Sequence, residues 1–320
     1  MNYRSINDLN ACIVANLHRL PRDLDLIVGI PRSGLLAANL IALHLNLPMT
    51  DLKGFIESRR PEGGMRLKSL ESAAGRKSAG VVLLVDDSVH SGRAILSARQ
   101  RIADAGLGRR VISAGVFVDP NAVSKVDFYF DTCPMPRIFE WNLMHHPLLE
   151  QACVDIDGVL CRDPLEEEND DGAKYEKFLI TAEPFLIPSV TIGVLVTCRL
   201  EKYRQLTEAW LAKNGVSYQK LVMMDYPDKA ARIAAANYAG YKASVYRETG
   251  TMLFIESSSE QAGAIAQMAG RDVFCIETRE MLNPDFFAMA KRVAREPEIR
   301  RRVWKNGIES RMRRWLGLSN

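Results

Sequence analysis

Long apolar stretches, each followed by a polar turn, set the pattern of the first half of the chain. Leu24–Ile30 and Val81–Val85 are almost continuously apolar over strand lengths, which predicts strands buried on both faces of a parallel sheet. Ser5–Leu20 carries apolar residues at helical spacing, and Leu35–Leu45 and Ala94–Ala105 follow as further helices. Strands that alternate with helices predict an α/β domain.

The second half repeats this pattern. Apolar strands that end in polar residues are predicted within Gln151–Leu160, Gly193–Thr197 and Leu253–Ser258. We therefore expect an α/β protein with two doubly wound, parallel-sheet (Rossmann-like) domains in tandem. The predicted parts are residues 1–148, residues 149–284 with a small cap, and a basic helical tail over residues 285–320.

Composition supports two ordinary globular domains. The 320 residues are enough for two cores, and 47% hydrophobic and 25% charged residues are typical values. The six cysteines include no C-x-x-C pair, so the sequence indicates neither a zinc site nor a disulfide framework. No apolar run approaches the roughly 20 residues that span a bilayer, and we expect a cytoplasmic protein.

The net charge of +3 is unevenly distributed, because cations and tryptophans gather in Lys291–Leu316. An amphipathic helix of this kind suits an anionic membrane surface, which would place the protein at the inner face of the membrane. Nucleic-acid binding produces a similar pattern but is not favoured here. A solvated helix packed on the second domain is the alternative.

The central candidate site directly follows the apolar run Val81–Val85. Asp86 and Asp87 stand where ligands bind in open α/β sheets, and the small residues of Ser88–Gly92 suit a phosphate cradle at the next helix. Two carboxylates that hold sugar hydroxyls beside a phosphate site predict a ribose phosphate ligand. The predicted contacts of this motif are Asp86, Asp87, Ser88, Val89, Ser91, Gly92, Arg93 and Ala94.

This motif resembles the fingerprint of the type I phosphoribosyltransferases, which bind phosphoribosyl diphosphate (PRPP). The turn Pro31–Gly34 lies some fifty residues earlier and resembles the diphosphate loop of that family. The resemblance implies that Arg32, Ser33 and Gly34 bind PRPP. It also implies a hood loop over Glu57–Lys77, with Arg59 or Arg60 as candidate contacts.

His90 lies inside the central motif, where purine salvage enzymes of the family carry an acid. An imidazole there suits a general base that takes a proton from a hydroxyl acceptor. A structural histidine is the alternative. Phe139, Trp141 and the pair His145–His146 are candidates for an acceptor pocket or for an interface core.

A second candidate site begins at Asp155 and Asp157, whose side chains point the same way along an extended strand. This segment resembles the D-x-D-G-[VT] signature of the haloacid dehalogenase superfamily of phosphatases. The resemblance implies that Asp155 attacks phosphorus, that Asp157 shuttles a proton and that Thr197 holds the phosphoryl group. Lys242 would balance the charge of the phosphoaspartate, with Lys229 as the competing candidate.

The same resemblance implies Mg²⁺ as cofactor, with Asp155, Asp157 and Glu256 as ligands. The sequence departs from the family at Glu256, where two acids are usual. Glu260 or Ser258 would have to help complete the metal site.

Together the two resemblances suggest consecutive reactions. A phosphoribosyl group would pass from PRPP to a hydroxyl of a lipid-linked glycan, and a phosphatase would then remove the 5-phosphate to leave ribofuranose. A nucleobase salvage enzyme coupled to a nucleotide phosphatase and a PRPP-binding regulator are the alternatives. A homodimer is a further expectation, because the transferase family is often dimeric.

Overall fold

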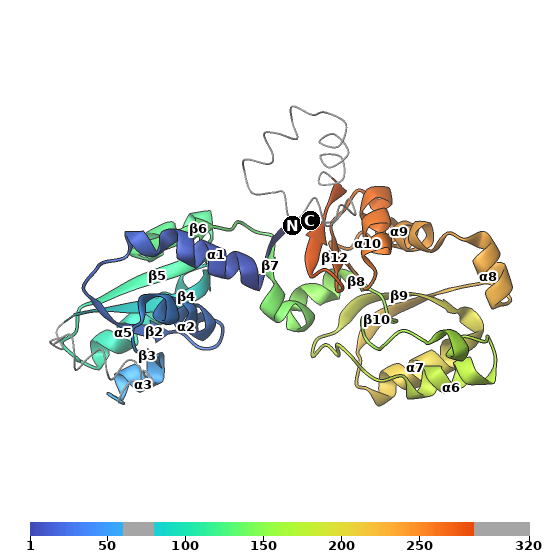
Figure 1. The fold of residues 1–320 in the computed structure, drawn as a ribbon, viewed down its shortest axis with the longest axis horizontal. Coiled ribbons are helices and arrows are strands. Elements are labelled where there is room, and N and C mark those ends of the chain that lie inside the picture. Colours follow the sequence, from blue (N-terminus) through green and yellow to red (C-terminus); the bar gives the residue numbers. More distant parts are fainter. Residues whose placement is uncertain (60–79, 285–320) are drawn as a thin grey trace, which may run out of the picture. The chain divides into compact units, whose positions relative to one another are not determined.

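A computed structural model describes residues 1–59 and 80–284 (Figure 1). The chain divides into two compact units, Met1–Trp141 and Asn142–Asn320. The predicted basic tail, with its membrane contact, and residues 60–77 of the predicted hood loop lie outside the described residues. The predicted boundaries at 148 and 284 stay predictions.

The first unit is built on a five-stranded parallel sheet with the order β3-β2-β4-β5-β6. The central strand β4 pairs with β2 on one side and with β5 on the other, because its apolar side chains are buried on both faces. The strands are β2 (Leu24–Gly29), β3 (Met49–Asp51), β4 (Val81–Val89), β5 (Val111–Val118) and β6 (Phe128–Thr132).

Helices cover both faces of this sheet. Leu83 and Val85 of β4 pack into one core with residues of α1 and α2, whereas Val82 and Leu84 pack into a second core with residues of α3 and α5. This alternation is the period of two that a strand imposes on its side chains. The helices are α1 (Ile6–Asn16), α2 (Gly34–Leu45), α3 (Leu52–Ile56) and α5 (Arg93–Asp104).

Local signals determine where several of these helices begin. Ser5 caps α1 in a capping box with Asp8, and a short 3₁₀ segment, Leu17–Arg19, ends the region predicted as one helix. A further 3₁₀ segment, η2 (Pro120–Lys125), follows β5, and β1 (Asn2–Arg4) pairs with β7 (Arg137–Phe139) in a small parallel sheet.

The second unit contains a six-stranded sheet with the order β10-β9-β8-β11-β12-β13, parallel except for the last strand. Its central strand β8 is fully buried between β9 and β11. The strands are β8 (Ala152–Val154), β9 (Ile192–Leu200), β10 (Tyr218–Met224), β11 (Leu253–Glu256), β12 (Val273–Cys275) and β13 (Glu280–Leu282).

Helices of this unit lie between its strands, one of them in the segment between β8 and β9, and the predicted small cap stays a prediction. The helices are α6 (Ala173–Thr181), α7 (Arg204–Lys213), α8 (Lys229–Ala235), α9 (Tyr238–Thr249) and α10 (Ser259–Ala269), with 3₁₀ segments at Pro147–Gln151, Glu166–Glu168 and Glu201–Tyr203. A further 3₁₀ segment, Glu140–His145, crosses the boundary between the two units.

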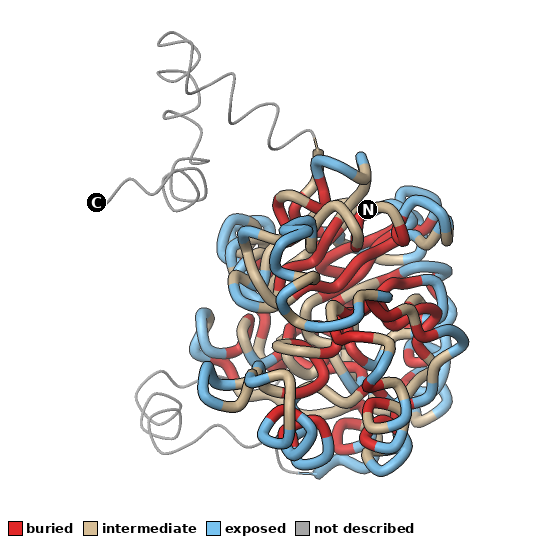
Figure 2. Tube along the Cα trace, turned by 90° about the vertical axis from the view of Figure 1, so that its right-hand side faces the viewer, coloured by how far each residue is buried: buried red, intermediate tan, exposed pale blue. Residues whose placement is uncertain are grey.

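Strands β4, β8 and β11 are buried along nearly their whole length, and Figure 2 marks the buried stretches of the trace in red and the exposed ones in pale blue. The predicted class, an α/β protein of two units with parallel sheets, is confirmed. Within the described residues, no helix combines the length and the apolar character that crossing a bilayer requires.

Candidate active sites

The first candidate site lies at the carboxyl end of β4, but the strand does not stop at Val85 as the sequence pattern predicts. Asp86 pairs with Gly115 and Ser88 with Phe117, so β4 continues to Val89. The carboxylates therefore lie within the strand, and the turn itself is His90–Gly92. Gly92 adopts a left-handed conformation (φ 79°) that favours glycine and precedes the first turn of α5.

The predicted diphosphate loop packs directly against these carboxylates. Gly34 begins α2, and a Cβ atom added to it would lie 2.9 Å from the Val85 carbonyl oxygen and 3.0 Å from Asp86 Oδ1. The Ile30 N–H also donates to the Val85 carbonyl at 2.9 Å. The structure thus brings the Arg32–Gly34 turn and the acidic pair together, and the exposed Arg32 stands beside a helix N-terminus that favours anions.

The acidic pair is electrostatically unusual. Asp86 and Asp87 are 9% and 2% exposed, and burial, followed by the neighbouring charge of Asp87, raises the pKa of Asp86 well above its ordinary value. The indole Nε1–H of Trp141 donates to Asp87 Oδ2 at 3.0 Å. The buried guanidinium of Arg137 also attracts both carboxylates. Sequence analysis missed the roles of Trp141 and Arg137.

A cavity of about 490 Å³ opens beside the turn. Phe139 and Trp141, which the sequence offered as pocket residues, instead stack on each other at 4.8 Å, with Phe139 in the core of the first unit. His145 bonds to Ser189 and His146 caps a 3₁₀ segment. The cavity is lined by His90, Ser91, Asp119, Pro120, Asn121, Pro134 and Met135.

At the start of the predicted hood loop, Arg59 forms ion pairs with two carboxylates of the first unit. Arg59 pairs with Asp51 at 3.1 Å and with Glu57 at 3.2 Å. Arg60 lies outside the described residues. The proposed contact of Arg59 with a ligand therefore requires that it leave these two carboxylates.

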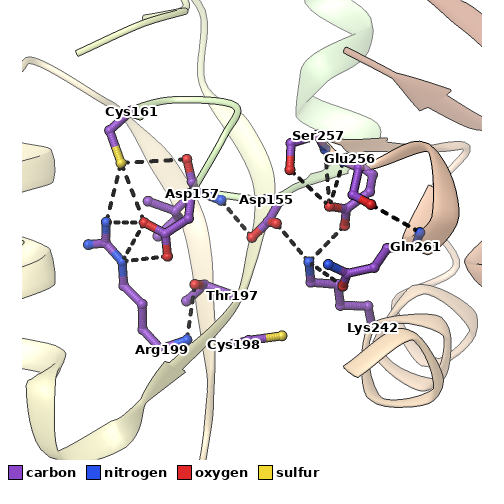
Figure 3. A network of polar contacts seen from close by, with 12 residues as sticks. Asp155, Asp157, Cys161, Thr197, Cys198, Arg199, Lys242, Glu256, Ser257 and Gln261 are labelled. Atoms are coloured by element: carbon purple, nitrogen blue, oxygen red, sulfur yellow. Dashed lines mark hydrogen bonds and ion pairs between the residues drawn. The ribbon is translucent and has the colours of Figure 1, made fainter. Parts of the chain in front are cut away.

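The second candidate site surrounds Asp155, directly after β8 (Figure 3). Lys242, on α9, places its ammonium 2.7 Å from Asp155 Oδ2 and 2.7 Å from Glu256 Oε2. Burial raises the pKa of Asp155, although the ammonium opposes this effect. Lys229, the competing candidate, instead bonds to the carbonyl of Asn169 through its ammonium. Lys242 is therefore the lysine that contacts Asp155.

On the other side of Asp155, Asp157 is held by a buried arginine that sequence analysis missed (Figure 3). Arg199 Nη2 donates to Asp157 Oδ1 at 2.7 Å, and Arg199 Nε lies 3.1 Å from Oδ2. Thr197 is fully buried in β9, and its hydroxyl accepts the Arg199 N–H at 3.2 Å. The spacing Thr197-x-Arg199 on a strand puts both side chains on one face, and this signal was available in the sequence.

The three predicted metal ligands do not form one ligand set. Lys242 lies between Asp155 and Glu256, and Arg199 occupies both oxygens of Asp157. In the parts of the chain that the structure describes, no group of three or more His, Cys, Asp or Glu side chains is placed to hold a metal ion. A carboxylate cluster neutralised by two cations does not fit Mg²⁺ in this conformation.

Comparison with known proteins identifies the first unit. Residues 2–150 match the family model described as the phosphoribosyl transferase domain. No curated protein matches the chain.

Among solved structures, the Helicobacter pylori xanthine-guanine-hypoxanthine phosphoribosyltransferase is 18% identical, with a TM-score of 0.33, over 44% of this chain and 92% of that one. The Pyrococcus horikoshii purine phosphoribosyltransferase is 20% identical, with a TM-score of 0.32, over 44% and 92%. The Aeropyrum pernix orotate phosphoribosyltransferase is 18% identical, with a TM-score of 0.28, over 39% and 70%.

Proposed function

We propose that this chain, whose residues 2–150 are a type I phosphoribosyltransferase domain, couples phosphoribosyl transfer to removal of the 5-phosphate. The first unit supplies phosphoribosyltransferase activity with PRPP as donor. The acceptor is a hydroxyl of a glycan, in the form of a lipid-linked oligosaccharide. The second unit then hydrolyses the phosphate ester and leaves a plain ribofuranosyl group.

In the first step, the turn Arg32–Gly34 at the N-terminus of α2 holds the departing diphosphate, which arrives as the Mg²⁺ complex of PRPP. Asp86 and Asp87 hold the ribose hydroxyls. The 5-phosphate binds at the N-terminus of α5, where His90–Gly92 lead into the helix and Ser91, Gly92, Arg93 and Ala94 offer donors. Ser88 and Val89 shape the end of the strand beneath that phosphate.

The lining of the cavity beside His90 is the observation that carries the choice of acceptor. Planar nucleobases are commonly held by stacking on aromatic rings. The described lining of this cavity contains imidazole, carboxylate, amide, hydroxyl, proline and methionine groups, whereas Phe139 is buried in the core and Trp141 bonds to Asp87. A polar and aliphatic surface of this kind suits a hydroxylated acceptor better than a base.

For the second step, the arrangement around Asp155 supports a phosphoryl-transfer nucleophile. The carboxylate follows a central parallel strand, and a buried ammonium 2.7 Å from it would offset the negative charge of the phosphoryl group. Attack of an Asp155 oxygen on phosphorus would break the bond to the ribose 5-oxygen, which leaves as a hydroxyl after taking a proton, and water would then hydrolyse the phosphoaspartate to release phosphate and restore Asp155. Asp157 would take part in proton transfer after release from Arg199, and Thr197 would bind the phosphoryl oxygens.

The test is diphosphate release from PRPP and Mg²⁺, with either a membrane glycolipid extract or a panel of nucleobases as acceptor. We expect release to depend on the extract. The Asp155→Asn variant should accumulate a phosphorylated glycan, whereas the Glu176→Gln variant, which changes an exposed acid on α6, should behave like the wild type. Release without a retained phosphate in Asp155→Asn would refute the second step.

Two other results would overturn the proposed acceptor. Release that depends on a nucleobase would establish a salvage enzyme. Tight PRPP binding without release under any condition would establish a PRPP-binding regulator.

A further inference from the structure

We propose that Asp119 is a positioning residue that orients His90 as the general base for the acceptor hydroxyl. This inference rests on the proposed transfer to a hydroxyl. Both side chains line the cavity beside the PRPP motif, and they come from the ends of two neighbouring parallel strands, β4 and β5. In open α/β sheets, ligands bind at the carboxyl ends of the strands.

Asp119 is rigidly held. It follows β5 and caps η2, and its Oδ1 accepts from the Asn121 backbone N–H at 3.0 Å and from the Asn121 side-chain amide at 3.1 Å. The Asn121 backbone hydrogen bond is the largest contribution that lowers the pKa of Asp119, so the group stays a carboxylate. Its side chain is 5% exposed, although it faces a cavity.

The second oxygen of this carboxylate faces the imidazole. Asp119 Oδ2 lies 3.5 Å from His90 Nδ1, and the His90 side chain is 62% exposed. A carboxylate at Nδ1 favours the tautomer with its proton on Nδ1, which leaves the lone pair of Nε2 free to accept a proton. Hydrogen bonds of this kind are often long before substrate binds and tighten in the complex.

The surrounding charges are compatible with this role. The buried guanidinium of Arg137 attracts Asp119 as well as Asp86 and Asp87, so the carboxylate is stabilised without being neutralised by direct contact. Arg137 Nη1 bonds to the carbonyl of Cys133 at 3.0 Å. The position of Asp119 is thus fixed from two sides, by Asn121 and by the strand end, while His90 remains accessible.

The acceptor oxygen forms a bond to the anomeric carbon of PRPP, and the bond between that carbon and the diphosphate oxygen breaks. Diphosphate leaves with the electron pair, and the proton of the acceptor hydroxyl passes to His90 Nε2. Asp119 then faces an imidazolium, whose charge it stabilises without itself taking the proton.

The first test is a mutant cycle on diphosphate release with the membrane glycolipid extract as acceptor. His90→Gln, Asp119→Asn and the double variant are compared with the wild type. We expect Asp119→Asn to lower kcat by about 10- to 100-fold, while its KM for PRPP stays within about twofold. The double variant should be no slower than His90→Gln, because Asp119 acts through His90.

The matched control is Asp127→Asn. Asp127 also accepts a backbone N–H, from Ser113 at 2.8 Å, but it does not line the cavity, so we expect its kcat to be unchanged. Multiplicative losses in the double variant, or an Asp119→Asn effect confined to KM, would overturn the inference.

The second test does not depend on the acceptor. In full-length protein with ¹⁵N-labelled histidine, neutral His90, assigned with His90→Gln, should show mainly the Nδ1–H tautomer, and Asp119→Asn should shift it towards Nε2–H. An unchanged tautomer ratio would overturn the inference whatever the acceptor. If diphosphate release by the wild type does not depend on the extract, but Asp119→Asn still shifts the tautomer ratio as expected, only the proposed acceptor would be refuted.

Discussion

Replacing Lys242 with methionine tests the charge balance of the second unit. The Lys242 side chain is 2% exposed, and its ammonium lies 2.7 Å from both Asp155 and Glu256, which are themselves 7% and 0% exposed at their side chains. Methionine keeps much of the length of the side chain but removes the cation. Two buried carboxylates would then face each other without a countercharge.

Because these groups are buried, we expect Lys242→Met to lower the free energy of unfolding of the second unit. Removing one partner of a buried ion pair typically destabilises a protein by about 3–5 kcal/mol, because the remaining charge is uncompensated. Exposed pairs contribute about 0–1 kcal/mol. The matched control is therefore Lys202→Met, because Lys202 pairs with Asp171 at 3.0 Å but is 38% exposed.

The loss should also depend on pH. Without the ammonium, the folded-state pKa of Asp155, already raised by burial, rises further. A folded state that binds more protons than the unfolded state loses stability as pH rises. Because the pKa of Asp155 is already raised to about 8 in the wild type, the extra destabilisation by Lys242→Met should grow as the pH rises above about 8.

Hydrogen exchange of the full chain, followed by mass spectrometry, measures this effect locally. Peptides from β8, β9 and β11 should lose about 3–5 kcal/mol of opening free energy when the pH is raised above 8, while peptides from β4 and β5 of the first unit should not change. A loss under about 1 kcal/mol, or an equal loss in Lys202→Met, would show that the ammonium does not stabilise this cluster.

Three further changes test the first site. The Asp86→Asn variant should exceed the wild type in Tm by a margin that grows from pH 5 to pH 8, because burial raises the pKa of Asp86 and the ionised group destabilises the fold. Its affinity for PRPP, measured by calorimetry, should fall. Gly34→Ala should raise the KM for PRPP by about tenfold or more, because the added methyl meets the Val85 carbonyl at 2.9 Å. Trp141→Phe should cost about 1.5–3 kcal/mol in urea unfolding, because Asp87 loses a donor at 3.0 Å.

Each of these has a result that would contradict it. A Tm margin for Asp86→Asn that does not vary with pH would mean that Asp86 is already ionised in the fold. An unchanged KM in Gly34→Ala would mean that the turn does not contact PRPP. An unfolding free energy of Trp141→Phe equal to that of the wild type would mean that water replaces the indole without cost.

The elements were predictable from the sequence where local pattern decides them. The apolar run at Val81–Val85 predicts β4, and the Ser5 cap predicts the start of α1. The predicted end of β4 at Val85 was wrong, because hydrogen bonding to β5 keeps the polar residues Asp86 and Ser88 within the strand. The residues around β4 do not show that β5 pairs with it, so they do not predict where β4 ends.

The polar contacts were predictable only where a residue sits at a strand end. Asp119 directly follows β5 at the carboxyl end of the sheet, so its place after an apolar strand predicts that it lies near the site. Arg137 acts on the acidic pair through its charge and Trp141 through a hydrogen bond to Asp87, each from about fifty residues away in the chain, and no short motif records this. Lys242 was chosen from the order of motifs, and its contacts with Asp155 support that choice over Lys229.

The strand order of the first unit also affects its synthesis on the ribosome. β2 pairs with β3 soon after both have been made, but its other edge needs β4, about fifty residues later in the chain. At a translation rate of about 5–20 residues per second, this edge of β2 stays unpaired for several seconds. During this interval the nascent chain exposes an unpaired strand, so we expect it to bind ribosome-associated chaperones and its yield to depend on the pace of translation across this stretch.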